Sequence, residues 1–361
     1  MKISIGSHII KGPWGGGNLF IINLRNYLIK KGHTVVHDLI DKDIDLILLT
    51  DPRGKNSTSS SFDHKEIEDY LDTVNPNTSV VHRINECDER KQTKGLNSFY
   101  LEASNVADEV VFVSNWLREI YLNLGIGNEN SSVILSGADS SIFNRENSLK
   151  WKKDEKLKII THHWSSNFNK GYPTYKELDN LIGTNKWKDK VEFTYVGNVS
   201  EDFKLNNTKI VEPKEGIELA KLLKSHHLYV TGSINEPSGN HHIEAAQCGL
   251  PILYLESGGI TEYCENFGIG FTDDFELKLE KIIQDYDNLF EIMEKYTLSA
   301  ESMCREYLEL FEKLIEIKKA RKINFKPGFK SKLYRTTQVR KKYVRLIKET
   351  LKNTIRNLIN K

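Results

Sequence analysis

Short apolar runs alternate with segments of helical period along most of the chain. The first candidate strands are Ile3–Ile5, Thr34–His37, Asp45–Thr50, Ser79–Ile84, Glu109–Val113 and Ser132–Leu135. Between the first two of these runs, Ile21, Leu24 and Leu28 recur at helical spacing. They predict a helix from Asn18 to Lys31, which Gly32 ends. The repeated strand–helix order favours right-handed βαβ units and a parallel sheet.

A second series of the same kind follows the polar, turn-rich segment 144–155. Its candidate strands are Leu157–Thr161, Val191–Val196, Lys209–Glu212, His227–Thr231, Pro251–Leu255 and Gly268–Phe271. One long helical pattern then runs from Asp285 to Lys319. The pattern predicts an α/β protein with two parallel-sheet domains, residues 1–148 and 149–298. We expect C-terminal helices with a basic tail over residues 299–361.

Length and composition agree with this division. A chain of 361 residues exceeds the usual size of one domain, and 39% hydrophobic with 28% charged residues is typical of a globular protein. No run of about 18 apolar residues occurs, which argues against a transmembrane helix. The start of the chain predicts a buried strand rather than an export signal. We therefore expect a cytoplasmic protein.

The net charge of +1 hides a strong asymmetry. Residues 318–361 contain 16 Lys or Arg and one acidic residue, whereas the rest of the chain carries 35 basic and 49 acidic residues. From Val339 onward, apolar residues recur at spacings of three and four, which predicts an amphipathic helix with a cationic face. We expect residues 330–361 to dock on an anionic membrane surface, which would make the protein peripheral. Packing against the acidic body or a partner protein, and binding to nucleic acid, are the alternatives.

The cysteines and histidines predict no metal site. The four cysteines are scattered without the spacing of metal ligands, which indicates free core thiols in a reducing compartment. No Asp-x-Asp motif stands at the end of a predicted strand. We expect neither a metal nor a cofactor.

The segment from Glu236 to Pro251 carries the candidate chemistry. Glu236 and Glu244 are separated by seven residues across a predicted helix start at Asn240. A helix N-terminus offers unpaired backbone N–H groups to a phosphate, and a carboxylate accepts hydrogen bonds from sugar hydroxyls. Either carboxylate alone could be explained by compensation of the helix dipole. Together they predict a pocket for a nucleotide sugar.

This segment, continued by Ser257-Gly-Gly-Ile-Thr-Glu262, resembles the donor-binding signature of the retaining glycosyltransferases of family four, also called group 1. The resemblance implies two Rossmann-like domains facing a central cleft, the GT-B architecture. It implies transfer of a sugar from a nucleotide-sugar donor, with retention of configuration and without a metal. The acceptor would be a glycan, a lipid-linked sugar or a cell-surface polysaccharide.

The resemblance also implies roles for matching residues. Glu236 would contact the transferred sugar and act in catalysis, and Glu244 would bind the ribose hydroxyls. Donor contacts through nearby backbone are implied for Ser238, Gly239, Gly258 and Gly259. Glycine suits these places because a Cβ would block close approach.

A second match lies at the end of the strand that begins at Leu157. The pair Lys170-Gly171 matches the family's Lys-Gly, so Lys170 would neutralise the charge of the leaving diphosphate. The family's Arg is missing, and Trp164 and Ser165 occupy its approximate place. His162 and His163 are the candidates to replace it, and we assign His163 to donor binding.

The first half of the chain would supply the opposite wall of the donor pocket. Residues 12–18 form a glycine loop between a strand and a helix, and Gly16 and Gly17 would approach the phosphate and the acceptor. Where the family usually ends a strand with a His, this chain has Asn85, which we count among the catalytic residues as a hydrogen-bond donor. His82, three residues earlier, is either a buried strand residue or a substrate contact.

Other functions remain open at this stage. A nucleotide-sugar epimerase or a phosphorylase could use the same architecture, and the basic tail alone could serve a nucleic-acid-binding protein. The acidic body and the few aromatic residues in the tail argue against nucleic acid. The sugar, the base and the acceptor depend on loops such as 51–54 and 88–91, which no short motif decodes.

Overall fold

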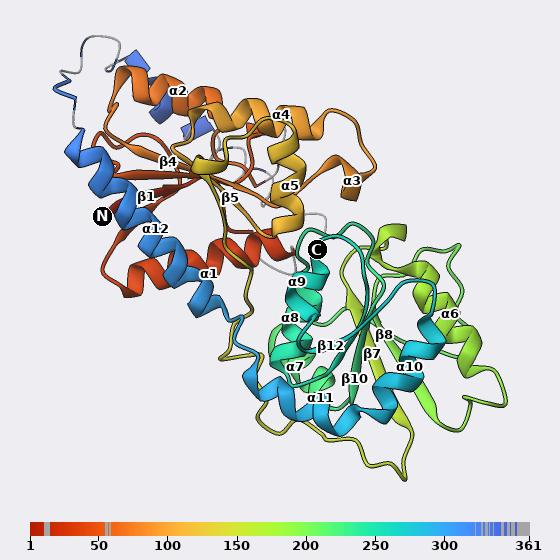
Figure 1. Cartoon of the computed structure of the whole chain (residues 1–361). Helices are drawn as coiled ribbons and strands as arrows, with labels where there is room; N and C mark the ends of the chain where they lie inside the picture. The colour runs from red at the N-terminus through yellow and green to blue at the C-terminus, as the bar shows by residue number, and fades with distance from the viewer. Residues whose placement is uncertain are drawn as a thin grey trace.

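The computed structural model shows two α/β domains side by side (Figure 1). It describes residues 1–10, 15–54, 57, 59–321, 323–325, 328, 331, 333–334, 336–340, 343–344, 347 and 351. Each domain is built on a six-stranded parallel sheet covered by helices on both faces. The predicted α/β fold with two Rossmann-like domains is confirmed.

The first sheet has the order β2-β1-β3-β4-β5-β6. Its strands are β1 (Lys2–Ile5), β2 (Thr34–Val36), β3 (Leu46–Leu49), β4 (Ser79–Ile84), β5 (Glu109–Phe112) and β6 (Ser131–Val133). Strands β3 and β4 are buried at every position, as expected for parallel strands covered on both faces. All six strands predicted in the first half are confirmed.

The second sheet has the order β12-β11-β10-β7-β8-β9. Its strands are β7 (Leu157–His163), β8 (Val191–Gly197), β9 (Lys209–Val211), β10 (Leu228–Thr231), β11 (Ile252–Leu255) and β12 (Gly268–Phe271). The predicted strands of the second half are confirmed as well. The strand order reverses beside β1 in the first sheet and beside β7 in the second. Such a switch point opens a crevice at the carboxyl ends of the strands.

Helices connect the strands in both domains. In the first domain they are α1 (Gly16–Lys30), α2 (His64–Thr73), α3 (Asp88–Lys91), α4 (Leu96–Ala103) and α5 (Asn115–Asn123), with the 3₁₀ turns η2 (Ser104–Val106) and η3 (Asn128–Asn130). The second half contains η4 (Phe168–Lys170), α6 (Tyr172–Ile182), α7 (Gly216–Lys224), α8 (Asn240–Gln247), α9 (Ile260–Cys264), α10 (Phe275–Gln284), α11 (Tyr286–Ile292), η5 (Met293–Lys295) and α12 (Ala300–Ala320).

Helix α1 follows the predicted pattern closely. Ile21, Leu24 and Leu28 are buried in the core of the first domain. The helix ends at Lys30, and Gly32 follows the cap residue with a φ of +85°, its amide donating to the Ile29 carbonyl oxygen at 2.9 Å. Periodicity and terminator were therefore sufficient to place this helix.

The long helix predicted from Asp285 to Lys319 is wrong in its middle. Helix α11 and the turn η5 end before Tyr296, and Ser299 then caps α12 by accepting from the Ser302 amide at 3.1 Å. The break exists because the chain leaves the second domain here and returns to the first. Helix α12 lies beside α1 (Figure 1), and the rings of Tyr307 and Phe20 meet at 5.2 Å.

The outgoing and returning chains touch where they pass between the domains. Ala300 donates its amide to the Ala138 carbonyl oxygen at 2.7 Å. A Cβ on Gly137 would lie 2.1 Å from the Ser299 carbonyl oxygen, so glycine is required by close backbone contact. The crossing fixes the path of both connections.

Most of the basic tail predicted to bind membranes lies outside the described residues. Leu333, Tyr343, Ile347 and Leu351 are exposed. Tyr334 instead contacts the first domain, donating its hydroxyl to the Glu66 carbonyl oxygen at 3.2 Å. Within the described ranges, none of the helices has the length and apolar character needed to cross a membrane. The four cysteines are buried and free, as predicted.

We predict that Gly137→Ala destabilises the protein by about 2 kcal/mol or more, because the new methyl group overlaps the Ser299 backbone. Thermal denaturation should show a lower melting temperature. Gly127→Ala is the matched control, since a Cβ there meets nothing within 4 Å and its φ of −64° suits any residue. Equal melting temperatures for the two variants would contradict the prediction.

Candidate active site

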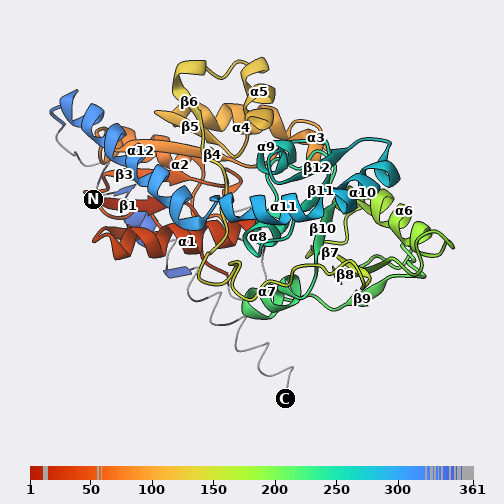
Figure 2. The ribbon, with the colours of Figure 1, turned by 60° about the horizontal axis from the view of Figure 1, so that its bottom comes forward.

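A cavity of about 1180 Å³ lies between the two domains, at the carboxyl ends of both sheets. The first domain contributes the N-terminus of α1 and the loop after β4, and the second contributes η4, α8 and the loop before α8. The turned view in Figure 2 shows the N-terminal end of α1 next to α8. Among the predicted site residues, the cavity is lined by Gly16, Gly17, Asn85, His163, Lys170, Glu236, Ser238, Gly239 and Glu244.

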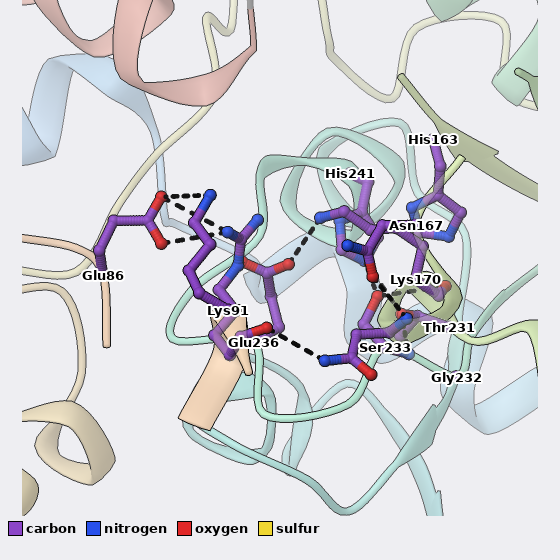
Figure 3. Close-up of polar contacts among 12 residues, drawn as sticks. Glu86, Lys91, His163, Asn167, Lys170, Thr231, Gly232, Ser233, Glu236 and His241 are labelled. Atoms are coloured by element: carbon purple, nitrogen blue, oxygen red, sulfur yellow. Dashed lines mark hydrogen bonds and ion pairs between the residues drawn. The ribbon is translucent and has the colours of Figure 1, made fainter. Parts of the chain in front are cut away.

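Glu236 is held between cations from both domains (Figure 3). Lys170 Nζ lies 2.7 Å from Glu236 Oε2, and Arg90 Nε donates to Glu236 Oε1 at 2.9 Å. Arg90 also pairs with Glu86 at 3.1 Å, and Lys91 approaches the same Glu86 carboxylate at 3.3 Å. The cluster links η4 and the loop before α8 to α3 of the other domain.

Burial and charge oppose each other at Glu236. Burial alone would raise the pKa of this carboxyl group, but the nearby charges of Lys170 and Arg90 hold the pKa well below its usual range. Burial likewise works against the Arg90 charge, while Glu236 and Glu86 raise the Arg90 pKa. Glu236 and Arg90 are therefore both charged at neutral pH.

Local backbone geometry places Lys170. Asn167 caps the turn η4 by accepting from the Asn169 amide at 2.8 Å. Gly171 follows with a φ of +106°, and a Cβ there would lie 2.6 Å from the Gly232 carbonyl carbon. The glycine of the Lys-Gly pair therefore lets η4 press against the loop after β10, which carries the lysine toward Glu236.

Two helix N-termini meet at the cavity. Helices α1 and α8 begin after Gly15 and Gly239, without a side-chain cap and without an acidic residue in the first turn. The helices approach so closely that a Cβ on Gly16 would lie 2.9 Å from Asn240 Oδ1. Helix α8 starts at Asn240, with Gly239 in the cap position predicted for Asn240 itself. Both positive helix ends thus face the cavity, and none of the described side chains caps either of them.

Glu244 is fixed by a chain of hydrogen bonds within the second domain. His162 Nε2 lies 3.0 Å from Glu244 Oε2, and the Tyr229 hydroxyl lies 3.3 Å from His162 Nδ1. A carboxylate accepts only, so His162 Nε2 carries the proton of its bond to Glu244. This chain orients the buried Glu244 toward the cavity.

His163 is directed into a buried ring cluster. Its Nε2 lies 2.5 Å from the Tyr175 hydroxyl, and its ring lies 4.7 Å from that of His241. Burial, followed by the charge of Lys170, lowers the His163 pKa well below its ordinary value. His163 is thus neutral, and it does not replace the charge of the missing Arg.

Gly258 and Gly259 support the Glu236 loop instead of bordering the cavity. Gly259 donates its amide to the Glu236 carbonyl oxygen at 2.9 Å. A Cβ on Gly258 would lie 2.5 Å from that same oxygen. The structure therefore differs from the expected direct donor contact, because the two glycines pack beneath the loop.

Of the two residues predicted near the end of β4, Asn85 reaches the cavity and His82 does not. Asn85 borders the cavity and is partly exposed. His82 is fully buried, hydrogen-bonded to Ser104 Oγ at 2.9 Å and stacked on Tyr100. Burial lowers the His82 pKa to about 3. Of the two readings left open for His82, the buried strand residue is confirmed.

Sequence reasoning missed Arg90 and the contacts that bring it to the site. The segment 88–91 stood out as a charged loop, but nothing in it indicates a partner 146 residues away in the chain. Glu262 makes a second interdomain contact, accepting from the backbone amides of Asn115 and Trp116 at 2.7 Å each. It thereby caps α5 of the other domain.

Within the described part of the chain, no group of three or more His, Cys, Asp or Glu side chains is placed to hold a metal ion.

Comparison with known proteins agrees with this geometry. Residues 176–297 match the family model for glycosyl transferases group 1. A probable sucrose-phosphate synthase of Thermosipho melanesiensis is 36% identical over an alignment of 109 residues, and the match covers 27% of this chain. The match spans about a quarter of that protein's length, namely 25%.

Solved structures share the fold. Sucrose-phosphate synthase from Thermosynechococcus elongatus superposes with a TM-score of 0.61 at 15% identity, covering 88% of this chain and 99% of that one. Anabaena HepE, solved in complex with UDP and glucose, gives a TM-score of 0.59 at 14% identity, covering 86% and 99%. The resemblance predicted from the sequence is confirmed, since residues 176–297 match the group 1 glycosyl transferases and the chain shares the fold of the two-domain glycosyltransferases.

Proposed function

We propose that this protein transfers a sugar from a nucleotide-sugar donor to a glycan or lipid-linked acceptor, with retention of the anomeric configuration. The observation that carries the proposal is the Glu236 carboxylate, held ionised between Lys170 and Arg90 where the N-termini of α1 and α8 converge. This arrangement offers a negative group to a developing sugar cation beside positive groups for a departing diphosphate.

The diphosphate binds at the two helix ends. Backbone N–H groups after Gly15 and Gly239 donate to phosphate oxygens, and Lys170 neutralises the charge that grows on the leaving group. The bond from the anomeric carbon to the phosphate oxygen breaks, and that oxygen keeps the electron pair. The acceptor oxygen bonds to the same face of the sugar, and its proton passes to the departing phosphate. No step calls for a metal.

Arg90 supplies the second cation that the missing family Arg would provide. It comes from the first domain, and its contact with Glu236 requires the two domains to lie together. Approach of a diphosphate lets Lys170 and Arg90 exchange part of their pairing with Glu236 for pairing with phosphate. The Glu236 carboxylate then turns toward the sugar.

The nucleoside binds along α8. Glu244, oriented by His162, accepts hydrogen bonds from the ribose hydroxyls. Uridine is the base to test first, because Anabaena HepE of the same fold was solved with UDP and with UDP-glucose.

The acceptor binds against the first domain, beside Asn85. A second cavity of about 430 Å³, lined in part by Arg53 and Phe99, adjoins this wall and leaves room for an extended acceptor. Docking of residues 330–361 on the cytoplasmic face of a membrane would bring a lipid-linked acceptor to this wall.

We predict that Glu236→Gln lowers kcat for sugar transfer about 10²–10³-fold, because it removes the negative charge beside the reacting sugar. The Kd for UDP, measured by calorimetry, should not rise, since Lys170 and Arg90 become free to bind phosphate. Unchanged kcat in a folded variant would eliminate the assigned role.

We predict that Lys170→Met, unlike Glu236→Gln, impairs both UDP binding and kcat. Loss of the cation should weaken UDP binding about tenfold or more as well as lower kcat, since a charge-assisted contact to phosphate is removed. Lys188→Met, an exposed position of the same domain, is the control. Retained UDP affinity in Lys170→Met would place the diphosphate elsewhere.

We predict that Glu244→Gln raises the Kd for UDP about tenfold, because an amide oxygen accepts the ribose hydroxyls less strongly than a carboxylate. Glu192→Gln, exposed on β8, is the control.

Acceptor-free conversion of the donor into another nucleotide sugar by the wild-type protein would instead identify an epimerase.

A further inference from the structure

Arg83 is a buried cation in the wall of the cavity. It lies near the end of β4, and Asn85 follows directly after the strand; both residues line the cavity. The Arg83 side chain is 5% exposed, and its guanidinium carbon lies 4.0 Å from the centre of the Phe20 ring of α1. Stacking on Phe20 holds the planar group in one orientation beside the cavity.

Within the described part of the chain, no carboxylate pairs with this guanidinium. Among the described residues, none of the Asp or Glu side chains forms an ion pair with Arg83, and its Nε is fully buried without a hydrogen-bond partner. One polar group that interacts with Arg83 is the Tyr307 hydroxyl. Burial raises the pKa of that hydroxyl well above its ordinary value, so Tyr307 is neutral and leaves the positive charge uncompensated.

The other cations of the cavity wall are paired. Arg53 forms two hydrogen bonds with the Asp51 carboxylate at 2.8 and 3.0 Å. Arg90 and Lys170 share Glu236. A buried ion without a partner is strongly unfavourable unless something compensates it. Its position in a cavity wall makes a bound anion the compensation that the surrounding residues do not provide.

We propose that Arg83 binds an anionic group of the acceptor, a phosphate or a carboxylate, through its planar guanidinium. The inference rests on the proposed glycosyl transfer and names the chemical class of the acceptor. Arg83 belongs to the acceptor wall because it lines the cavity from the first domain, next to Asn85 at the end of β4. The donor diphosphate has its own cation in Lys170 of the second domain. Two N–H groups of a guanidinium match two oxygens of a phosphate or carboxylate.

The experiment compares acidic and neutral sugars as ligands of the wild-type protein saturated with UDP. The probes are hexose 6-phosphates, hexuronates, the corresponding free hexoses and inorganic phosphate, each followed by thermal shift and calorimetry. Acidic sugars should raise the melting temperature where free hexoses of equal concentration do not. Hexose phosphates and hexuronates separate the two anions, and inorganic phosphate shows whether the sugar contributes.

Arg83→Gln should bind the best acidic sugar at least tenfold more weakly, and its affinity for UDP should be unchanged. Lys318→Gln is the matched control, since Lys318 pairs with Asp108 away from the cavity. Arg83→Met removes the charge and keeps an apolar chain against Phe20. Without ligand, it should melt at the same temperature as the wild type or higher.

Three outcomes would overturn the inference. Equal affinity of Arg83→Gln and wild type for every acidic probe would show that Arg83 does not bind the anion. Weakened UDP binding would assign Arg83 to the donor. A lower melting temperature of ligand-free Arg83→Met would show that the charge is structural. Donor binding and donor hydrolysis by the wild-type protein test the proposed function separately, because neither requires an acceptor.

Discussion

The pairing of one carboxylate with cations from two domains is the interaction on which the site depends. Without Glu236, the buried charges of Lys170 and Arg90 would repel each other across the closed interface. With it, the domains can meet before any ligand is present, and both cations stay in place for a phosphate. The same carboxylate thus serves assembly of the ligand-free site and the proposed chemistry.

Backbone contacts give this ion cluster a rigid frame. Gly171 lets the lysine turn press against the loop after β10, and Gly259 donates to the carbonyl group of Glu236 itself. Glu262 joins the second domain to the start of α5, close to where Gly259 packs on Ser114. Residues with no contact to the cavity therefore set the position of those that line it, and the glycines act through space that a methyl group would occupy.

The sequence predicted what depends on local order. Strands such as β3 are continuous apolar runs because both of their faces are buried, and the Glu236–Glu244 block is contiguous, so both were recognisable. Arg90 was missed because its partner is fixed by the meeting of two domains, which no local pattern records. The break at Tyr296–Ser299 was missed because helical periodicity resumes on the far side, and only the return to the first domain requires extended chain.

The crossing at Gly137 and Ser299 makes the second domain an insertion within the first. Helix α12 supplies Tyr307 and Phe311 to the core that contains Phe20 of α1. During synthesis on the ribosome, the first sheet therefore leaves the exit tunnel long before the helix that covers part of it. The inserted domain has all its strands by then, so its core can close before the core of the first domain, which was begun earlier.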